Sequence, residues 1–295
     1  MSATAAADPR SVRRGYLLVF LAASLWGLIG VFSRKIGNEG VAPIEIAFWR
    51  AALSGVLFGL QARQERAPQV PRRELPKVLA FAAIGVALFY GSLNLSIDAG
   101  GLSLASVLLY SAPAFVTLIA WPLLGERPTL RKLALVALVL VGVALVAGGS
   151  GGGVVVSARS IGFGLLSGFA YSSFYWLGKP LISAHTTALV FAYVMPIGAL
   201  LLLPFVEFHH KTPAAWAWLG ALVFFSTYGA YLAYGFGVQR VDASSAVLVA
   251  TIEPVISLAL AALLFGERFG VRGAIGSACV IGAALLASMS SRRTE

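Results

Sequence analysis

The sequence contains few of the residues that build disulfides and metal centres. It has one cysteine in 295 residues, and Cys279 lies within an apolar run, so neither a disulfide framework nor a thiolate metal site is expected. The three histidines, His185, His209 and His210, fall in the segments that connect apolar runs. A buried histidine-based metal centre therefore has no candidates. We predict no catalytic residue, no metal site and no cofactor, and a protein that is not an enzyme.

Charged residues are also scarce. They make up 12% of the chain, whereas 59% of the residues are hydrophobic, and the mean hydropathy is +0.87. Soluble domains carry about 25% charged residues, so the composition predicts a polytopic membrane protein. The net charge of +10 would suggest nucleic acid in a soluble protein. Here the basic residues lie almost entirely between apolar runs, so we assign them to membrane topology and expect no nucleic-acid partner.

Ten apolar runs are long enough to cross the roughly 30 Å hydrocarbon core of a bilayer. The connecting segments are short, and only Arg63–Arg73 resembles a hydrophilic loop, so no soluble catalytic domain fits between them. We predict an all-α membrane protein with ten transmembrane helices, at 16–33, 46–62, 76–97, 102–124, 133–150, 161–178, 187–206, 214–237, 243–265 and 273–291.

The basic residues predict the orientation of these helices. Most of the 22 lysines and arginines fall on one side if the amino terminus is inside, and this predicts that both termini are cytoplasmic. The opposite side receives a minority, among them Arg34, Lys35 and Arg50, which this count treats as loop charges.

An internal repeat organises the chain. The segment 102–127 recurs at 243–268, with eight identical positions that include Pro113/Pro254 and a closing Gly-Glu-Arg triplet. A proline removes a helical hydrogen bond, which membrane helices tolerate next to protein or a water-filled cavity. We therefore predict that Pro113 and Pro254 are hinges. Five spans per copy is an odd number, so the copies must enter the membrane from opposite faces, as in many secondary transporters.

The predicted domains follow from this repeat. Two five-helix repeats occupy 15–148 and 161–291, the linker is 149–160, and the cytoplasmic tails are 1–14 and 292–295. Within the closing triplets, Glu126 and Glu267 stand beside Arg127 and Arg268, and we interpret them as structural ion pairs.

The chain resembles a known family at these motifs. The proline and Gly-Glu-Arg pattern of the fourth and ninth spans, the pair Glu253-Pro254 and the pair Trp26-Gly27 look like EamA-type permeases of the drug/metabolite transporter superfamily. The overall match is most similar to the YddG-type exporters, which move aromatic and other amino acids out of bacteria. The resemblance implies a multi-pass protein of the bacterial inner membrane, with a substrate cavity lined by the first, third, fourth, sixth, eighth and ninth helices.

Polar residues on two of these helices form matching stripes. On the fourth span Tyr110 is the main candidate for the lining, and on the ninth span Ser244 and Thr251 occupy the equivalent face. Small hydroxyl residues also serve helix packing. Glu253 lies near the middle of the ninth span, where an ionisable group is a functional candidate. It could bind an amine or carry a proton, and a structural hydrogen-bonding role is the alternative.

Aromatic and amide side chains complete the predicted site. Asn94 must find a hydrogen-bond partner in a substrate or in a neighbouring helix. Tyrosine rings can stack on a ring or a cation, although aromatics near helix ends are commonly belt residues at the headgroups. The further candidates on the first, third, sixth and eighth spans are Trp26, Tyr90, Tyr171, Tyr175, Tyr228 and Tyr234.

These residues suit a ligand that is partly apolar and partly charged. We expect a secondary transporter that exports aromatic and other neutral amino acids and related metabolites by alternating access. The expected partners are these small molecules and the lipid bilayer, and the expected state is a monomer. A multidrug or quaternary-cation exporter is an alternative, and a membrane-embedded enzyme or a channel is an alternative of another class.

Overall fold

The computed structural model describes residues 9–112, 114–116, 118–119, 130–147, 153–238, 240, 249–250, 252–268 and 270–290. The first predicted span is two helices, α1 (Pro9–Gly27) and α2 (Ile29–Asn38), which meet at Leu28. Further along, Pro43 is the first residue of its helix. Proline is tolerated there because the N–H that it lacks would have no partner within the helix. Ser157, Thr186 and Thr212 cap three later helices through their side-chain oxygens.

Helices occupy most of the described residues in the segments predicted to be apolar spans. The first half continues with α3 (Pro43–Gln64), the 3₁₀ turn η1 (Arg72–Glu74), α4 (Leu75–Phe81), η2 (Ala82–Leu88), α5 (Phe89–Gly100), α6 (Leu102–Leu109) and α8 (Leu130–Ala147). The second half contains α9 (Ala158–Ser173), η3 (Phe174–Gly178), α10 (Lys179–Ala184), α11 (Thr187–Leu202), η4 (Leu203–Phe205), α12 (Pro213–Val223), η5 (Phe224–Gly229), α13 (Ala230–Val238), α15 (Ile252–Phe265) and α16 (Val271–Ser290).

Five helical stretches of the described residues are long and apolar enough to cross a membrane. They are Val12–Asn38, Pro43–Gln64, Arg72–Gly100, Thr187–Phe205 and Pro213–Gly237. Shorter apolar helices include Leu133–Gly142, Val255–Phe265 and Val271–Ala283. The all-helical membrane class is confirmed, whereas the count of ten crossings stays a prediction.

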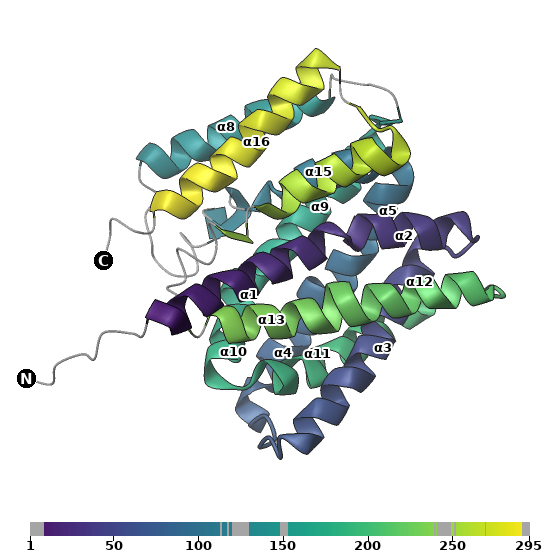
Figure 1. Cartoon of the computed structure of the whole chain (residues 1–295), viewed down its shortest axis with the longest axis vertical. Helices are drawn as coiled ribbons and strands as arrows, with labels where there is room; N and C mark the ends of the chain where they lie inside the picture. Colours follow the sequence, from purple (N-terminus) through teal and green to yellow (C-terminus); the bar gives the residue numbers. More distant parts are fainter. Residues whose placement is uncertain are drawn as a thin grey trace, which may run out of the picture.

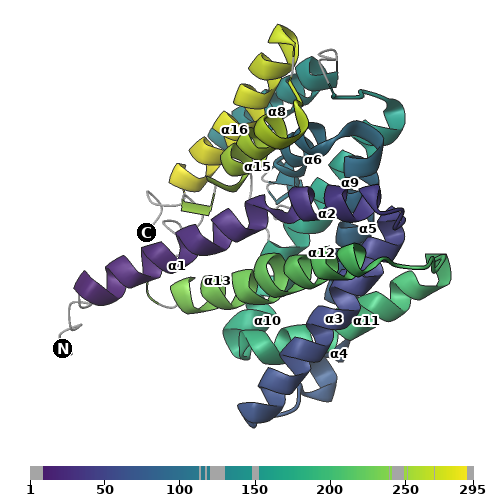
Figure 2. The same ribbon diagram turned by 45° about the vertical axis from the view of Figure 1, so that its right-hand side comes forward.

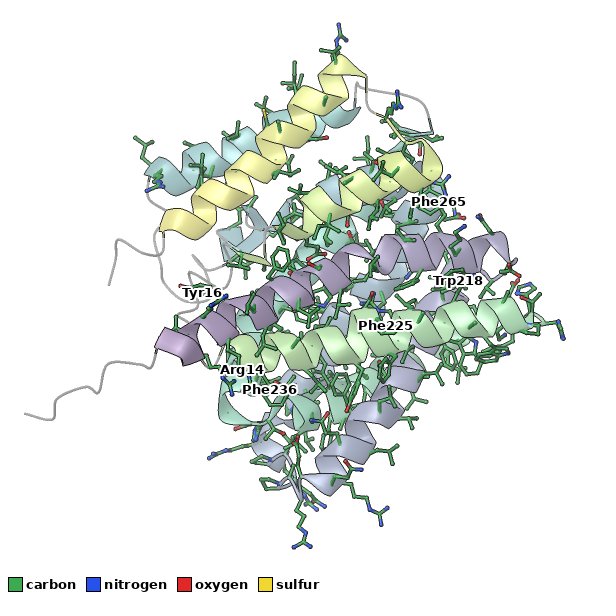
Figure 3. All side chains as sticks on the ribbon, in the orientation of Figure 1. Arg14, Tyr16, Trp218, Phe225, Phe236 and Phe265 are labelled. Carbon is green, nitrogen blue, oxygen red and sulfur yellow. The ribbon has the colours of Figure 1, made fainter. Side chains whose placement is uncertain are left out.

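Large apolar side chains cover the outside of these helices. Leu263 is 81% exposed and Val271 is 78% exposed, and Figure 3 shows Phe225 and Phe236 on the outer face of the rod formed by α12, η5 and α13. An apolar surface of this extent suits hydrocarbon rather than water.

Helices from the two halves lie side by side. Helix α1 packs along α13, α3 along α11, and α5 along α9, so the interior of the bundle is shared between the halves (Figure 1). Helices α8 and α16 form a separate pair, with α15 between this pair and the rest in both views (Figure 2). The first turns of α1 and the last turns of α16 lie on the same side of the molecule.

Three stretches of π-helix, which is wider than an α-helix, interrupt the described helices. They are η2, η3 and η5, and they fall in the third, sixth and eighth predicted spans. Such bulges shift the helical register and are frequent at functional sites. No pattern in the sequence predicts them. Beyond such a bulge, the spacing of residues along the chain no longer predicts which face of the helix a residue occupies.

Candidate functional site

The centre of the bundle contains a hydrogen bond between the two halves. The hydroxyl of Tyr110 donates to Oε2 of Glu253 at 2.9 Å, and the two residues are 7% and 8% exposed. Tyr110 follows the last residue of α6, and Glu253 lies in the first turn of α15. The hydrogen bond therefore joins the matching segments of the internal repeat.

The main chain is irregular where Tyr110 sits. Its N–H bonds the carbonyl of Val107 at 3.1 Å, and the N–H of Ser111 bonds the carbonyl of Leu108 at 3.0 Å, which is a tighter turn than an α-helix makes. Helix α6 ends at Leu109, four residues before Pro113, which lies outside the described residues. A proline clashes with the carbonyl four positions earlier, and this accounts for an end at Leu109.

Glycines bring neighbouring helices close to this centre. A Cβ built at Gly168 of α9 would lie 3.0 Å from the carbonyl oxygen of Leu108. A Cβ at Gly27, where α1 ends, would lie 2.7 Å from Cγ2 of Ile256 and 3.4 Å from the main-chain oxygen of Glu253. Both helices approach so closely because these positions carry no side chain.

Aromatic rings form one wall beside Glu253. The ring of Trp26 lies 5.7 Å from that of Tyr231 and 5.2 Å from that of Tyr234, and Tyr231 stacks on Phe191 at 4.4 Å. Tyr228 is connected to this wall through Phe58 of α3, whose ring lies 5.0 Å from that of Tyr228 and 5.2 Å from that of Phe191. Residues three apart are offset by about 60° around a helix, and the bulge η5 displaces Tyr228 further.

A buried arginine stands next to the predicted Tyr90. Arg50 of α3 is 0% exposed, and its guanidinium carbon lies 3.9 Å above the centre of the Tyr90 ring. Its Nε donates to Oγ1 of Thr227 at 2.9 Å, and the hydroxyl of Tyr90 contacts Sδ of Met195 at 3.7 Å. Treating Arg50 as a loop charge was wrong. The missed signal was its position inside a predicted span, where an ionisable residue is a candidate by default.

A pocket leads toward these residues from one end of the bundle. It has a volume of about 340 Å³ and is lined by residues of α2, α3 and α5 and by 153 and 155. Asn94 lines it and donates from Nδ2 to the carbonyl of Tyr90 at 2.8 Å. Among the described residues, Asn94 Oδ1 and Ser33 Oγ, both on lining residues, are buried without hydrogen-bond partners. The pocket thus presents an amide oxygen that can accept a hydrogen bond and a hydroxyl that can donate or accept one.

The remaining predicted residues are placed as follows. Tyr171 packs against Phe89 at 5.4 Å and Phe174 at 5.6 Å, in the aromatic cluster between α5 and α9. The side chains of Tyr175 and Pro254 lie outside what the structure describes, as do Ser244, Thr251 and Pro113. The binding and hinge roles of all these residues stay predictions.

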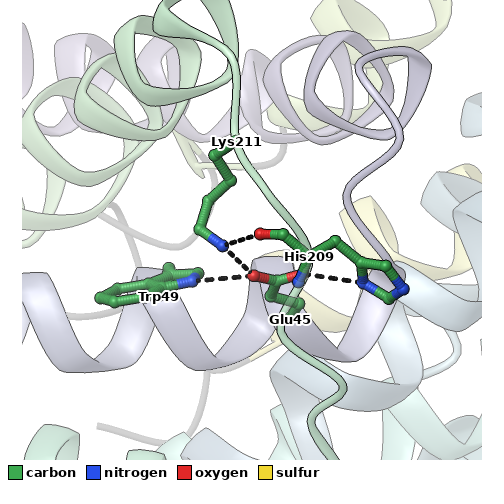
Figure 4. A network of polar contacts seen from close by, with 4 residues as sticks. All are labelled: Glu45, Trp49, His209 and Lys211. Atoms are coloured by element: carbon green, nitrogen blue, oxygen red, sulfur yellow. Dashed lines mark hydrogen bonds and ion pairs between the residues drawn. The ribbon is translucent and has the colours of Figure 1, made fainter.

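Two networks of charged groups lie at the same end of the bundle as the pocket. Glu267 is 2% exposed and forms an ion pair with Arg34 rather than with the exposed Arg268, which corrects the pairing expected from the sequence. Glu45 is 0% exposed and binds Lys211, the Trp49 indole and the main chain of His209 (Figure 4). Within the described ranges no three His, Cys, Asp or Glu side chains could share a metal ion.

This helical bundle has an apolar outer surface, broken helices and a buried polar centre between two halves, which is an architecture found in many membrane transporters. The chain belongs to the EamA-like transporter family, whose sequence model matches it twice, at 13–148 and 158–289.

Relatives of known sequence are transporters. The chain is 26% identical over 270 residues to an uncharacterized transporter of Archaeoglobus fulgidus, covering 90% of this chain and 95% of that protein. It is 27% identical to the uncharacterized inner membrane transporter YicL of Salmonella typhimurium, covering 96% and 98% of the two chains. It is 26% identical to the "Probable terminal-alkyne amino-acid exporter" of Streptantibioticus cattleyicolor, covering 85% and 86%.

One solved crystal structure has the same fold. It superposes with a TM-score of 0.63 at 23% identity, covering 95% of this chain and 98% of the other.

Proposed function

We propose that this transporter exports aromatic and other neutral amino acids and related metabolites across the bacterial inner membrane. The observation that carries the proposal is the buried hydrogen bond between Tyr110 and Glu253 beside the wall of Trp26, Tyr231 and Tyr234. A carboxylate at this depth can bind an ammonium group, and tyrosine and tryptophan faces accept a ring, an aliphatic chain or a cation. The amino-acid exporter among the relatives supports the same substrate class.

Alternating access is the proposed mechanism. Ten helices in two inverted repeats, 15–148 and 161–291, would rock about the centre, with both termini cytoplasmic. Pro113 and Pro254 would bend the helices, and Tyr175, Ser244 and Thr251 would complete the lining. The end of α6 at Leu109 and the two family-model matches support this arrangement.

A quaternary-cation exporter is the second candidate, because Glu253 and the aromatic wall could also bind a cation that has no carboxylate. A counterflow assay in proteoliposomes that hold the purified protein distinguishes the two candidate functions. Labelled phenylalanine, tryptophan and leucine are placed on one side of the membrane and tetraphenylphosphonium on the other. We expect saturable counterflow of the amino acids and weak competition by the cation. Counterflow of the cation alone would support the second candidate, and flux without counterflow would support a channel. Repeating the assay with a pH gradient tests coupling to protons.

A further inference from the structure

Arg50 is a buried cation whose hydrogen bonds are incomplete. Its side chain is 0% exposed and lies in α3, seven residues after the helix begins at Pro43. Among the described residues, Nε donates to Oγ1 of Thr227, whereas Nη1 and Nη2 are buried and have no hydrogen-bond partner. The two outer nitrogens of the guanidinium are therefore unsatisfied donors within the part of the chain that the structure describes.

An unmatched guanidinium inside a membrane protein is costly. Arginine keeps its proton under all ordinary conditions, so it cannot lower the cost by becoming neutral. Buried charges are normally paired, and intramembrane arginines pair with an acid or mark a substrate path. Among the described residues no carboxylate is ion-paired with Arg50, although Glu253 is close enough to interact with it electrostatically. The carboxylate of Glu253 is instead held by Tyr110.

The surroundings hold the fork in one orientation. The ring of Tyr90 lies under the guanidinium at 3.9 Å, and the hydroxyl of Tyr90 is held by Met195. Thr227 fixes Nε from the second half of the chain, within the bulge η5. A planar fork fixed on one face and at one nitrogen leaves two parallel donors free, which is the geometry that a carboxylate accepts in a bidentate manner.

The pocket provides an approach to this fork. Ile46 and Asn94 line the pocket, and Arg50 and Tyr90 each lie one turn, about 6 Å, deeper on the same two helices. The unpaired oxygen of Asn94 is a neutral acceptor along this approach, and the unpaired hydroxyl of Ser33 can donate to a carboxylate. Arg34 and Asp98 also line the pocket, so a molecule that carries both an ammonium group and a carboxylate would meet one side chain of each charge before it reached Arg50.

We infer that Arg50 binds the carboxylate of the transported molecule, so that the substrates are carboxylate-bearing compounds and not simple amines or quaternary cations. This inference deepens the proposed amino-acid export and rests on it for the identity of the substrate. Thr227 and Tyr90 are positioning residues, because they hold the guanidinium and leave Nη1 and Nη2 free for the substrate.

The test uses three ligands that share a phenyl ring. Phenylalanine has both charges, 3-phenylpropionate has only the carboxylate, and phenylalaninamide has only the ammonium. Counterflow competition and ligand-induced thermal shifts are measured on the full chain for the wild type, Arg50→Gln and Arg50→Lys. The matched control is Arg63→Gln, since Arg63 is an exposed arginine at the other end of α3.

For Arg50→Gln we expect the half-saturating concentration of phenylalanine to rise roughly 10- to 100-fold, as loss of charge-assisted hydrogen bonds implies. Binding of 3-phenylpropionate should disappear and that of phenylalaninamide should stay unchanged. Arg50→Lys keeps the charge but not the fork, so it should fold even if Arg50→Gln does not and should lose about tenfold for the two carboxylates only. Arg63→Gln should match the wild type.

Two results would overturn the inference. One is an equal effect of the Arg50 variants on the binding of phenylalanine and on the binding of phenylalaninamide, which would indicate a structural role for Arg50. The other is the absence of carboxylate binding to the wild type. Failure of the export proposal is distinguishable from both. If the wild type carries no amino acid but 3-phenylpropionate still raises its melting temperature in an Arg50-dependent manner, amino-acid export is wrong and the carboxylate site stands.

Discussion

The carboxylate of Glu267 accepts a 2.7 Å hydrogen bond from the main-chain N–H of Ser103, 164 residues earlier in the chain. It also accepts the N–H of Leu102 at 3.1 Å, so Glu267, two residues after the end of α15, caps the beginning of α6. An acidic side chain at this position satisfies amide donors that the helix leaves free and complements its dipole. Together with the ion pair to Arg34, this contact ties the second half to the first.

Removing this contact should destabilise the protein. Glu267→Ala removes a buried carboxylate that pairs with the partly exposed Arg34 and caps α6, so we expect a loss of about 2 kcal/mol. Thermal unfolding in detergent measures it as a lower midpoint. Arg268→Ala is the control, because Arg268 is exposed and next in sequence. Equal midpoints for the two variants would contradict the role assigned to Glu267.

The close approach of α9 to the end of α6 gives a second prediction. Gly168→Ala places a Cβ 3.0 Å from the carbonyl oxygen of Leu108, and overpacking of this kind costs about 1 to 3 kcal/mol. Gly162→Ala on the same helix meets nothing within 4 Å, so it should be neutral or stabilising by up to about 1 kcal/mol. Parallel thermal melts compare the two. A Gly168→Ala variant as stable as Gly162→Ala would show that the helices do not meet here.

Glu253 is predicted to act on the substrate. Glu253→Gln keeps the shape and can still accept the Tyr110 hydrogen bond, but it removes the negative charge that would hold an ammonium group. We expect the amino-acid counterflow rate to fall at least about tenfold while the amount of folded protein stays constant. Glu207→Gln, at an exposed position, should behave as the wild type. Should Glu253→Gln retain both rate and pH profile, Glu253 is a structural residue.

The proline hinges are tested by transport per folded molecule. Pro113→Ala and Pro254→Ala restore a main-chain N–H and remove a steric block to helix continuation. We therefore expect the transport rate to decrease more than the yield of folded protein in the membrane. Proteoliposome counterflow normalised to monodisperse protein measures this ratio. An unchanged ratio in both variants speaks against hinges at these positions.

The network of Glu45 is predicted to hold the 206–212 segment against α3. Glu45→Ala leaves Lys211, whose side chain is 7% exposed, without its partner, so we expect destabilisation by about 3 kcal/mol. Protease sensitivity of this segment should rise together with the fall in melting temperature. Glu207→Ala alters an exposed carboxylate of the same segment and should leave both measurements unchanged.

The sequence by itself determined the class of the protein, because apolar length and scarcity of charge are properties of composition. It also determined the family, through repeated motifs that need no coordinates. Among its candidate site residues, Trp26, Tyr90, Asn94, Tyr110 and Glu253 are buried in the structure or line the pocket, and their binding roles stay predictions.

Only the tertiary structure decided which side chains meet. Arg50 counts as a loop charge in a tally of basic residues, but packing against Tyr90 and Thr227 buries it completely. Glu267 pairs with Arg34 rather than with its neighbour, and Tyr228 packs on Phe58 of α3 whereas Tyr234 packs on Trp26 of α1. The physical reason is that burial and pairing depend on contacts between helices that are distant in sequence, and periodicity within one helix carries no information about its neighbour.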